Sequence, residues 1–299
     1  MSNNQTSEKN EKELFATNPL IKRIAIVFDF DETLAPDTYT ALLEHCGFDA
    51  DTFEEEKVQP LLDDGWDKKL ARFYVLMQEA AERDDLNLTA ETFVEVGQNL
   101  ELYPEVEKMF DRVTSYAHDI LPDVEVEFYL LTAGVLEIPR ATAVSDRFRT
   151  LWGGELYFDD DGNLAFVKQV VTYADKIRYL LKLCKGMNID DPKIKQDVYR
   201  DVAPEEWHVP LNQLVYVGDG DSDMPVFSYL TEHEGLAIGV FASDEVAGWE
   251  GYEDIHGGQR VQNLASADYQ EGSELMESLR LAVESICKQI ALREMSEGE

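Results

Sequence analysis

The sequence predicts an α/β fold in which a mostly parallel sheet lies between two layers of helices, with an all-helical segment inserted after the first strand. Strand-like runs recur at long intervals, and helical patterns fill most of the gaps between them. Residues 37–103 interrupt this alternation, because helical periodicity dominates there and strand signal is nearly absent. The 299 residues, 44% of them hydrophobic, suffice for a core domain and an inserted domain.

The chain begins with a polar segment, residues 1–20, that we expect to be a disordered tail. It lacks the apolar region of a secretory signal, and no later apolar run approaches the roughly 18–20 residues of a membrane span. Cys46, Cys184 and Cys287 lie too far apart to suggest a disulfide framework or a zinc site. These observations predict a cytoplasmic protein without a membrane partner.

The predicted strands are apolar and rich in β-branched residues. Four of them are expected at residues 23–28, 124–131, 213–217 and 236–241. A shorter pair, 155–158 and 164–167, flanks Asp161-Gly162. Because Asp-Gly is a strong hairpin signal, we expect this pair to form a small flap.

The predicted helices account for the inserted segment and the end of the chain. An apolar helix face is predicted from the spacing of Leu62, Trp66, Leu70, Phe73, Met77 and Ala80. Thr89 is a plausible N-cap of a second helix, and Pro104 suits the helix that returns the chain to the core. Residues 271–299 predict a C-terminal amphipathic helix and tail that pack on the core, with apolar positions at Leu275, Leu279, Leu281, Ile286 and Ile290.

The formal net charge of −35 excludes two classes of partner. Nucleic acids and anionic membranes are bound through basic patches, which 26 basic residues against 61 acidic ones do not favour. The same charge repels a phosphorylated substrate at long range, so a bound cation and a local lysine would have to reverse the potential inside a site. Nothing in the sequence predicts an oligomeric state.

Two carboxylates follow the first predicted strand. Asp29 and Asp31 are spaced two residues apart, so their side chains point to the same face at the carboxyl end of the strand. Ligands bind at this end of the strands in open α/β sheets. Two close carboxylates are not both readily ionised without a cation or a shared proton, which suits a nucleophile, an acid/base and a divalent metal ion.

The run Asp29-Phe30-Asp31-Glu32-Thr33 resembles the Asp-x-Asp-x-Thr signature of the haloacid dehalogenase-like (HAD) hydrolases, mostly magnesium-dependent phosphatases that act through a phospho-aspartyl intermediate. The resemblance extends from about residue 24 to about residue 241. It implies a Rossmann-like HAD core at residues 21–36 and 104–270. It also implies that residues 37–103 form the helical cap found in the phosphoserine phosphatase-like branch.

The resemblance assigns roles to both aspartates. Asp29 would be the nucleophile that attacks phosphorus, and Asp31 would protonate the leaving oxygen and then activate water. The metal would bind the carboxylate of Asp29 and the backbone carbonyl of Asp31. Dehalogenating members generally lack the second aspartate, so Asp31 favours phosphoryl transfer.

The second and third motifs supply groups that bind anions. Thr132, Ala133 and Gly134 follow a buried strand, where a hydroxyl and closely approaching backbone N–H groups suit a phosphate. Lys176 lies in the first turn of a helix that Thr172 is predicted to cap, and lysine at a helix N-terminus makes a phosphate site. Lys168 is the competing candidate for this lysine.

The fourth motif is an acidic loop, Gly218-Asp219-Gly220-x-x-Asp223, after an apolar strand. Mg²⁺ prefers carboxylate oxygens, and the resemblance makes this the metal motif. Asp219 would bind the metal directly, and Asp223 would bind it through water or anchor Lys176. The predicted metal ligands are therefore Asp29, Asp31, Asp219 and Asp223.

Together the motifs predict a Mg²⁺-dependent phosphomonoesterase that acts on a small phosphorylated metabolite. A phosphomutase or phosphotransferase using the same aspartates is the alternative. A non-catalytic ligand-binding protein on this fold is less consistent with the sequence, because binding alone has no chemical need for the whole set of motif residues. The sequence does not identify the substrate or the cap residues that select it. The most suggestive cap residues are Trp66, Lys68, Lys69 and Arg72, although Trp66 is expected in the core and the basic residues in solvent.

Overall fold

The computed structural model describes residues 20–83, 85–187, 189–190, 198–203, 206–220, 222–242 and 261–297, so the predicted tail lies outside the described residues up to position 19. Its sheet has seven strands in the order β4-β3-β2-β1-β5-β6-β7. The strands are β1 (Arg23–Phe28), β2 (Glu125–Val135), β3 (Thr150–Phe158), β4 (Leu164–Gln169), β5 (Leu214–Gly218), β6 (Leu236–Phe241) and β7 (Asn263–Ser266). Adjacent strands are parallel except β3 and β4, which confirms the predicted mostly parallel sheet.

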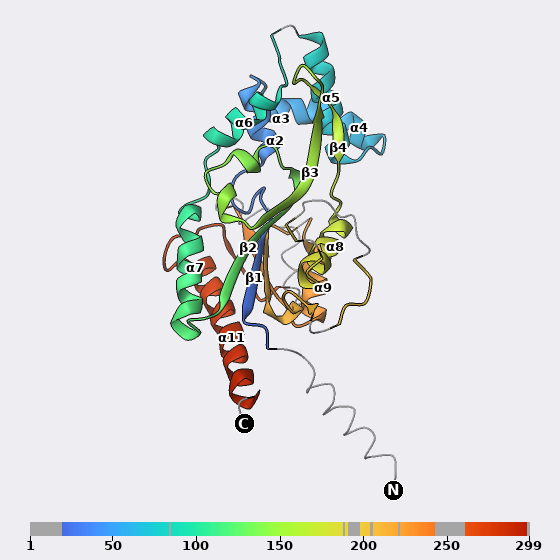
Figure 1. Ribbon diagram of the computed structural model, residues 1–299. Helices are drawn as coiled ribbons and strands as arrows, with labels where there is room; N and C mark the ends of the chain where they lie inside the picture. Colours follow the sequence, from blue (N-terminus) through green and yellow to red (C-terminus); the bar gives the residue numbers. More distant parts are fainter. Residues whose placement is uncertain are drawn as a thin grey trace.

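Helices cover both faces of the sheet (Figure 1). One face packs against α7 (Val106–Ile120) and α11 (Glu274–Glu297), and the other against α8 (Tyr173–Cys184) and α9 (Met224–Glu232). Alternate residues of β1 serve the two faces: Ile24 and Ile26 belong to the first apolar cluster, and Ala25 and Val27 to the second. The predicted three-layer α/β fold is therefore confirmed.

The strand predictions at residues 23–28 and 236–241 match β1 and β6, but β3 differs from the predicted flap. β3 begins at Thr150, pairs with β2 in the main sheet, and then forms the predicted hairpin with β4. Glycines in the middle of β3 weaken its strand signal in the sequence. Packing nevertheless requires a small residue there, because a Cβ at Gly153 would lie 2.8 Å from Thr132 Cγ2. β7 has only four residues and was not predicted.

The segment between β1 and α7 is helical and lies beyond the carboxyl end of the sheet, beside the β3–β4 hairpin (Figure 1). It contains α2 (Thr38–His45), α3 (Ala50–Phe53), a π-helical turn (Glu54–Val58), α4 (Gln59–Asp63), α5 (Lys68–Glu82) and α6 (Ala90–Asn99). Short 3₁₀ turns elsewhere span Pro139–Ala141, Ser145–Arg147 and Leu211–Gln213. A third apolar cluster joins these helices to Val135 at the end of β2, to Ile138 after it and to Leu156 of β3.

The predicted apolar face across residues 62–80 is wrong in part. The chain breaks the helix at Gly65, where φ is +91°, and α5 starts anew with Asp67 as its N-cap. Trp66 and Leu70 are 39% and 40% exposed, respectively. The side chains that α5 buries are Ala71, Phe73, Val75 and Leu76. By contrast, Thr89 caps α6 as predicted, accepting a hydrogen bond from the N–H of Thr92.

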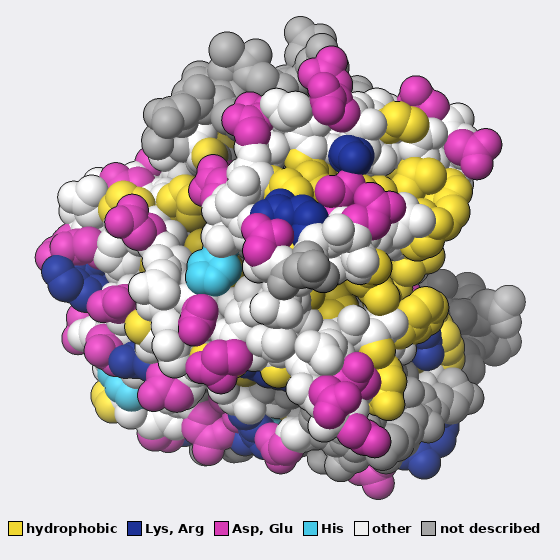
Figure 2. All heavy atoms as spheres, turned by 90° about the horizontal axis from the view of Figure 1, so that it is seen from above, with side chains coloured by type: hydrophobic (Ala, Val, Ile, Leu, Met, Phe, Trp, Pro, Cys, Tyr) yellow, Lys and Arg dark blue, Asp and Glu magenta, His cyan; other side chains and the backbone are white. Residues whose placement is uncertain are grey.

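The C-terminal helix α11 packs along α7. Leu275, Leu279, Ile286 and Ile290 are buried as predicted, whereas Leu281 is 57% exposed and faces away. No helix in the described part of the chain is long and apolar enough to cross a membrane. Carboxylate side chains are spread across the face drawn in Figure 2, where basic side chains are fewer, as the net charge leads one to expect.

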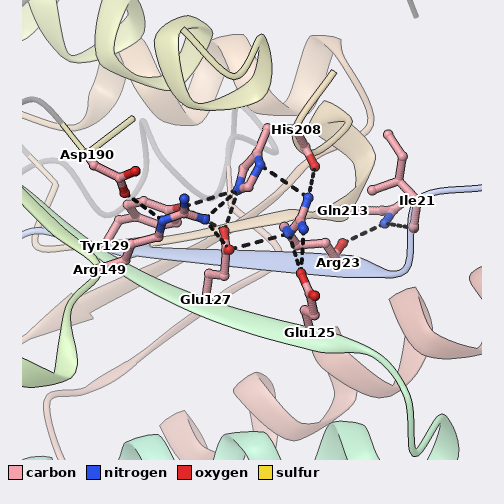
Figure 3. A network of polar contacts seen from close by, with 9 residues as sticks. All are labelled: Ile21, Arg23, Glu125, Glu127, Tyr129, Arg149, Asp190, His208 and Gln213. Atoms are coloured by element: carbon pink, nitrogen blue, oxygen red, sulfur yellow. Dashed lines mark hydrogen bonds and ion pairs between the residues drawn. The ribbon is translucent and has the colours of Figure 1, made fainter. Parts of the chain in front are cut away.

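A polar network ties the strands together at their amino ends, away from the site described below (Figure 3). Glu127 of β2 accepts hydrogen bonds from Tyr129 and His208, both at 2.6 Å, and pairs with Arg149. Burial by itself would raise the pKa of Glu127, but the hydrogen bonds from His208 and Tyr129 outweigh it and lower the pKa from 4.5 to about 2. The folded state therefore favours the ionised carboxylate.

We expect Glu127→Gln to destabilise the protein at pH 7 by about 2 kcal/mol, because the charge that holds this network is lost. A lowered pKa adds stability above pH 4.5 that is lost as pH falls toward 2. The difference in unfolding free energy between wild type and Glu127→Gln should therefore become smaller as the pH falls. Urea unfolding at pH 7, 5 and 3 measures this. Glu125→Gln is the control, since the Glu125 side chain is 62% exposed. A difference in unfolding free energy that grows as the pH falls would contradict the lowered pKa of Glu127.

Candidate active site

Asp29 is placed where β1 ends, between β2 and β5. Its N–H donates to the carbonyl of Val217 in β5 at 2.9 Å, and the N–H of Phe30 donates to Asp29 Oδ1 at 2.7 Å. The other oxygen, Oδ2, accepts hydrogen bonds from Lys176 Nζ at 2.6 Å and from Ser222 Oγ at 3.1 Å. Backbone pairing and these three donors fix the carboxylate in a single orientation.

Lys176 holds the centre of the site. Its side chain is completely buried, and Nζ lies 2.6 Å from Asp223 Oδ1, 2.9 Å from Ser222 Oγ and 3.3 Å from the Tyr216 hydroxyl. Burial alone would lower the pKa of Lys176, but the carboxylates of Asp223 and Asp29 outweigh it and raise the pKa above the usual value. A permanent ammonium thus neutralises part of the acidic cluster. The competing candidate, Lys168, pairs instead with Glu155 and is half exposed.

Local structure explains how Lys176 reaches this position. Thr172 caps α8 by accepting from the N–H of Asp175, and the Asp175 carboxylate accepts in return from the N–H of Thr172. This predicted capping pair fixes the first turn of α8, one residue before Lys176. The side chain then reaches Asp29 at the end of β1 and Tyr216 of β5.

Asp31 lies at the foot of the helical segment. Its Oδ1 accepts a hydrogen bond from the N–H of Thr38, the first residue of α2, at 2.8 Å. Its Oδ2 faces Gly134, where a Cβ would lie only 2.6 Å from that oxygen and 3.1 Å from Thr132 Oγ1. Burial, followed by repulsion from Asp37, raises the pKa of Asp31 to about 7. A carboxyl group in this setting can both donate and accept a proton near neutrality.

Three carboxylates form a group that could hold a cation. One oxygen from each of Asp29, Asp219 and Asp223 lies within 4.8 Å of the others. Burial and the neighbouring carboxylates raise the pKa of Asp219 well above its usual value, and burial also raises that of Asp29. Asp223 Oδ2 is buried without a hydrogen-bond partner. A divalent cation would relieve this repulsion, and an all-oxygen donor set fits Mg²⁺.

The site opens into a cavity of about 520 Å³ between the sheet and the helical segment. Its lining includes the predicted residues Asp29, Asp31, Thr132, Ala133, Gly134 and Asp219. Lys176 and Asp223 lie buried behind Asp29, so the structure brings all eight predicted residues to one place. The volume is typical of small-molecule sites.

Sequence reasoning missed two polar residues of this site. Ser222 contacts both Asp29 and Lys176, and the hydroxyl of Tyr216 donates to Asp223 Oδ1 at 2.6 Å. Ser222 stood inside the acidic loop, where a hydroxyl among aspartates was an available signal. Nothing in the sequence marked Tyr216 as a site residue, because a tyrosine is common in a buried strand.

No family model matches the sequence, and no curated protein matches it. Solved structures do match. A substrate-bound phosphoserine phosphatase complex aligns with a TM-score of 0.53 and 14% identity, over 87% of this chain and 98% of that chain. A probable phosphoserine phosphatase from Vibrio cholerae aligns with a TM-score of 0.54 and 15% identity, over 91% of this chain and 68% of that chain.

A HAD family hydrolase from Salmonella enterica serovar Typhi aligns over 75% of this chain with a TM-score of 0.51 and 13% identity. This chain covers 63% of that protein, which is less than two thirds of its length. At these identities the matches speak for the fold. They show that the chain shares the fold of these phosphatases, which is the fold that the Asp-x-Asp-x-Thr resemblance implied.

Proposed function

We propose that this protein is a HAD-type, Mg²⁺-dependent phosphomonoesterase that acts on a small phosphorylated metabolite. The observation that carries the proposal is the arrangement of Asp29 and Asp31 in one cavity, with Lys176 buried against Asp29 at 2.6 Å. A ligand-binding protein has no chemical need for a fixed nucleophile beside a carboxyl group suited to proton transfer. The fold of the matched phosphatases supports the same reaction class.

The chemistry proceeds in two displacements. An Asp29 oxygen attacks phosphorus, the bond to the ester oxygen breaks, and Asp31 gives its proton to the departing alcohol. Asp31, now ionised, takes a proton from a water molecule that attacks phosphorus. The acyl-phosphate bond breaks, and inorganic phosphate leaves with Asp29 restored. Both steps use the same two side chains on one side of the cavity.

The remaining site residues hold charge in place. The Thr132 hydroxyl and the N–H of Ala133 would bind the phosphoryl oxygens. The N–H of Gly134, which donates to Thr132 Oγ1 at 2.8 Å, would orient that hydroxyl or turn to the phosphoryl group itself. Lys176 keeps Asp29 oriented and offsets its charge. Asp29, Asp219 and the backbone carbonyl of Asp31 would hold Mg²⁺, and Asp223 would act through water or through Lys176. The metal ion would neutralise charge on the phosphoryl group.

We assign residues 21–36 and 104–270 to the catalytic core and residues 37–103 to a cap domain that screens the cavity from water. Leu42, Lys69 and Phe73 support this assignment, since they come from the helical segment and line the same cavity as Asp29. We place the protein in the cytoplasm, with a small phosphorylated substrate and neither nucleic acid nor membrane as partner.

The test is phosphate release from phenyl phosphate and a panel of small phosphomonoesters, with Mg²⁺ or with EDTA. We expect release with Mg²⁺ and a loss of at least about 100-fold with EDTA, because the clustered carboxylates then lack their counter-charge. Asp219→Asn should require a higher Mg²⁺ concentration for half-maximal rate. Isomer formation without net phosphate release would indicate a mutase instead. A folded protein that binds Mg²⁺ but turns over no ester would indicate a binding role.

A further inference from the structure

We infer that the substrate is a phosphomonoester with an apolar body and a second anionic group, and that Lys69 recognises this group. The inference rests on the proposed phosphomonoesterase function and deepens it. It depends on the side chains that the helical segment contributes to the cavity lining, beside those of the motif residues.

Lys69 is a cation in the lining of the cavity. It lies in the first turn of α5, is half-buried, and donates from Nζ to the carbonyl of Val171 at 3.1 Å. Its ammonium lies 5.7 Å from the ring centroid of Tyr173. No carboxylate of the described residues forms an ion pair with it. A partly desolvated ammonium with only a neutral acceptor favours an anionic ligand.

The other basic side chains at the cavity do not offer this. Arg72 is held by Asp37 at 3.3 Å and by Glu54 at 3.1 Å, and its guanidinium lies 4.6 Å from the ring centroid of Tyr39. Its charge is therefore already balanced. Lys68 also borders the cavity, but its side chain is exposed to water. In a protein of net charge −35, a cation at the cavity with no direct carboxylate partner among the described residues is informative, since Asp29, Asp67 and Asp31 act on it only from a longer distance.

The phosphoryl group has donors of its own, because the Thr132–Gly134 segment lines the cavity beside Asp31. Part of the cavity lining is apolar: Leu42, Phe73, Val135 and Ile138 are all buried and line the cavity. Phe73 is fixed by an edge contact with Tyr39, with ring centroids 5.8 Å apart. This surface suits a hydrocarbon or aromatic body better than a polyhydroxylated one.

Burial, followed by the charge of Lys176, lowers the pKa of Lys69 to about 8, against the opposing effect of the carboxylates of Asp29, Asp67 and Asp31. The ammonium is still the main form at pH 7, and an anion bound beside it would stabilise that form. The second anionic group of the substrate is a carboxylate or another phosphate, both of which an ammonium binds.

The test compares kcat/KM for phenyl phosphate, for 3- and 4-carboxyphenyl phosphate, and for 1,3- and 1,4-phenylene bisphosphate. We expect wild type to prefer at least one doubly anionic ester by about tenfold or more, the value of one charge-assisted contact. Lys69→Met should reduce this preference ratio about tenfold, mainly through KM, and Lys68→Met should leave the ratio within about twofold. The favoured ester distinguishes a carboxylate from a phosphate.

Equal use of all the esters by wild type would overturn the inference while leaving the proposed function intact. A Lys69→Met variant that loses all the esters in the same proportion would also overturn it, since Lys69 would then serve the phosphoryl group. If no ester is turned over, calorimetry can measure the affinities of wild type and Lys69→Met for benzylphosphonate and for 3- and 4-carboxybenzylphosphonate. These affinities test the same preference for a second anionic group. Equal or absent binding of these phosphonates would refute the role of Lys69.

Discussion

Replacing Asp29 with asparagine is expected to abolish phosphate release while leaving the protein folded. The amide has nearly the same shape as the carboxylate but lacks the charge needed to attack phosphorus and to bind a cation. We expect the rate to fall by at least about 1,000-fold, which corresponds to about 4 kcal/mol of lost transition-state stabilisation. Phosphate release from phenyl phosphate with Mg²⁺ measures the loss, and circular dichroism checks the fold.

Asp146→Asn is the control for this experiment. Asp146 is exposed and does not line the cavity, so its loss of charge should leave the rate unchanged. The fold should survive Asp29→Asn, because Lys176 keeps its 2.6 Å contact with Asp223. Turnover within about tenfold of wild type would rule out Asp29 as the nucleophile.

Lys176→Met is expected to have the largest effect on stability. The substitution preserves most of the buried volume but removes the ammonium that lies 2.6 Å from both Asp29 and Asp223. Two buried carboxylates would then face each other without a counter-charge, which costs about 3–5 kcal/mol. Urea unfolding monitored by tryptophan fluorescence measures the change, and phosphate release should be lost as well.

Lys168→Met provides the matched comparison. Lys168 pairs with Glu155 at 2.8 Å, but its side chain is 50% exposed, so its loss should cost less than about 1 kcal/mol. Added Mg²⁺ should recover part of the stability of Lys176→Met, because the cation would offset the same carboxylates. Equal stability of the two variants would show that Lys176 does not balance the acidic cluster.

The central strands could be predicted because their sequences are continuous and apolar. β1 is buried on both faces, and such strands stand out from their surroundings in any sequence. The two aspartates after it could be placed on one face from the period of a strand alone. Lys176 could be placed because Thr172 and Asp175 mark the start of its helix.

Other features depend on contacts that the sequence does not display. Gly153 in β3 looks like a loop residue until one sees that Thr132 packs against it. Trp66 fits a helical period, but the chain turns at Gly65 and leaves it partly exposed. Lys69 stands out in the sequence as a candidate cap residue but is expected to be solvated, because its proximity to Val171 arises only when the helical segment meets the start of α8. Local pattern therefore predicted the core of the site better than the part that selects the substrate.

The hydrogen bonds around Asp29 also have a consequence for how the protein acquires its activity. Lys176 lies 147 residues from Asp29 in the chain, and Ser222 lies 193 residues from it. Closing such long loops is slow and gains nothing until β1, β2 and β5 have paired. A partly folded chain that holds only its first two hundred residues thus lacks Asp219, Ser222 and Asp223. During synthesis the protein would stay catalytically silent until its last strands join the sheet.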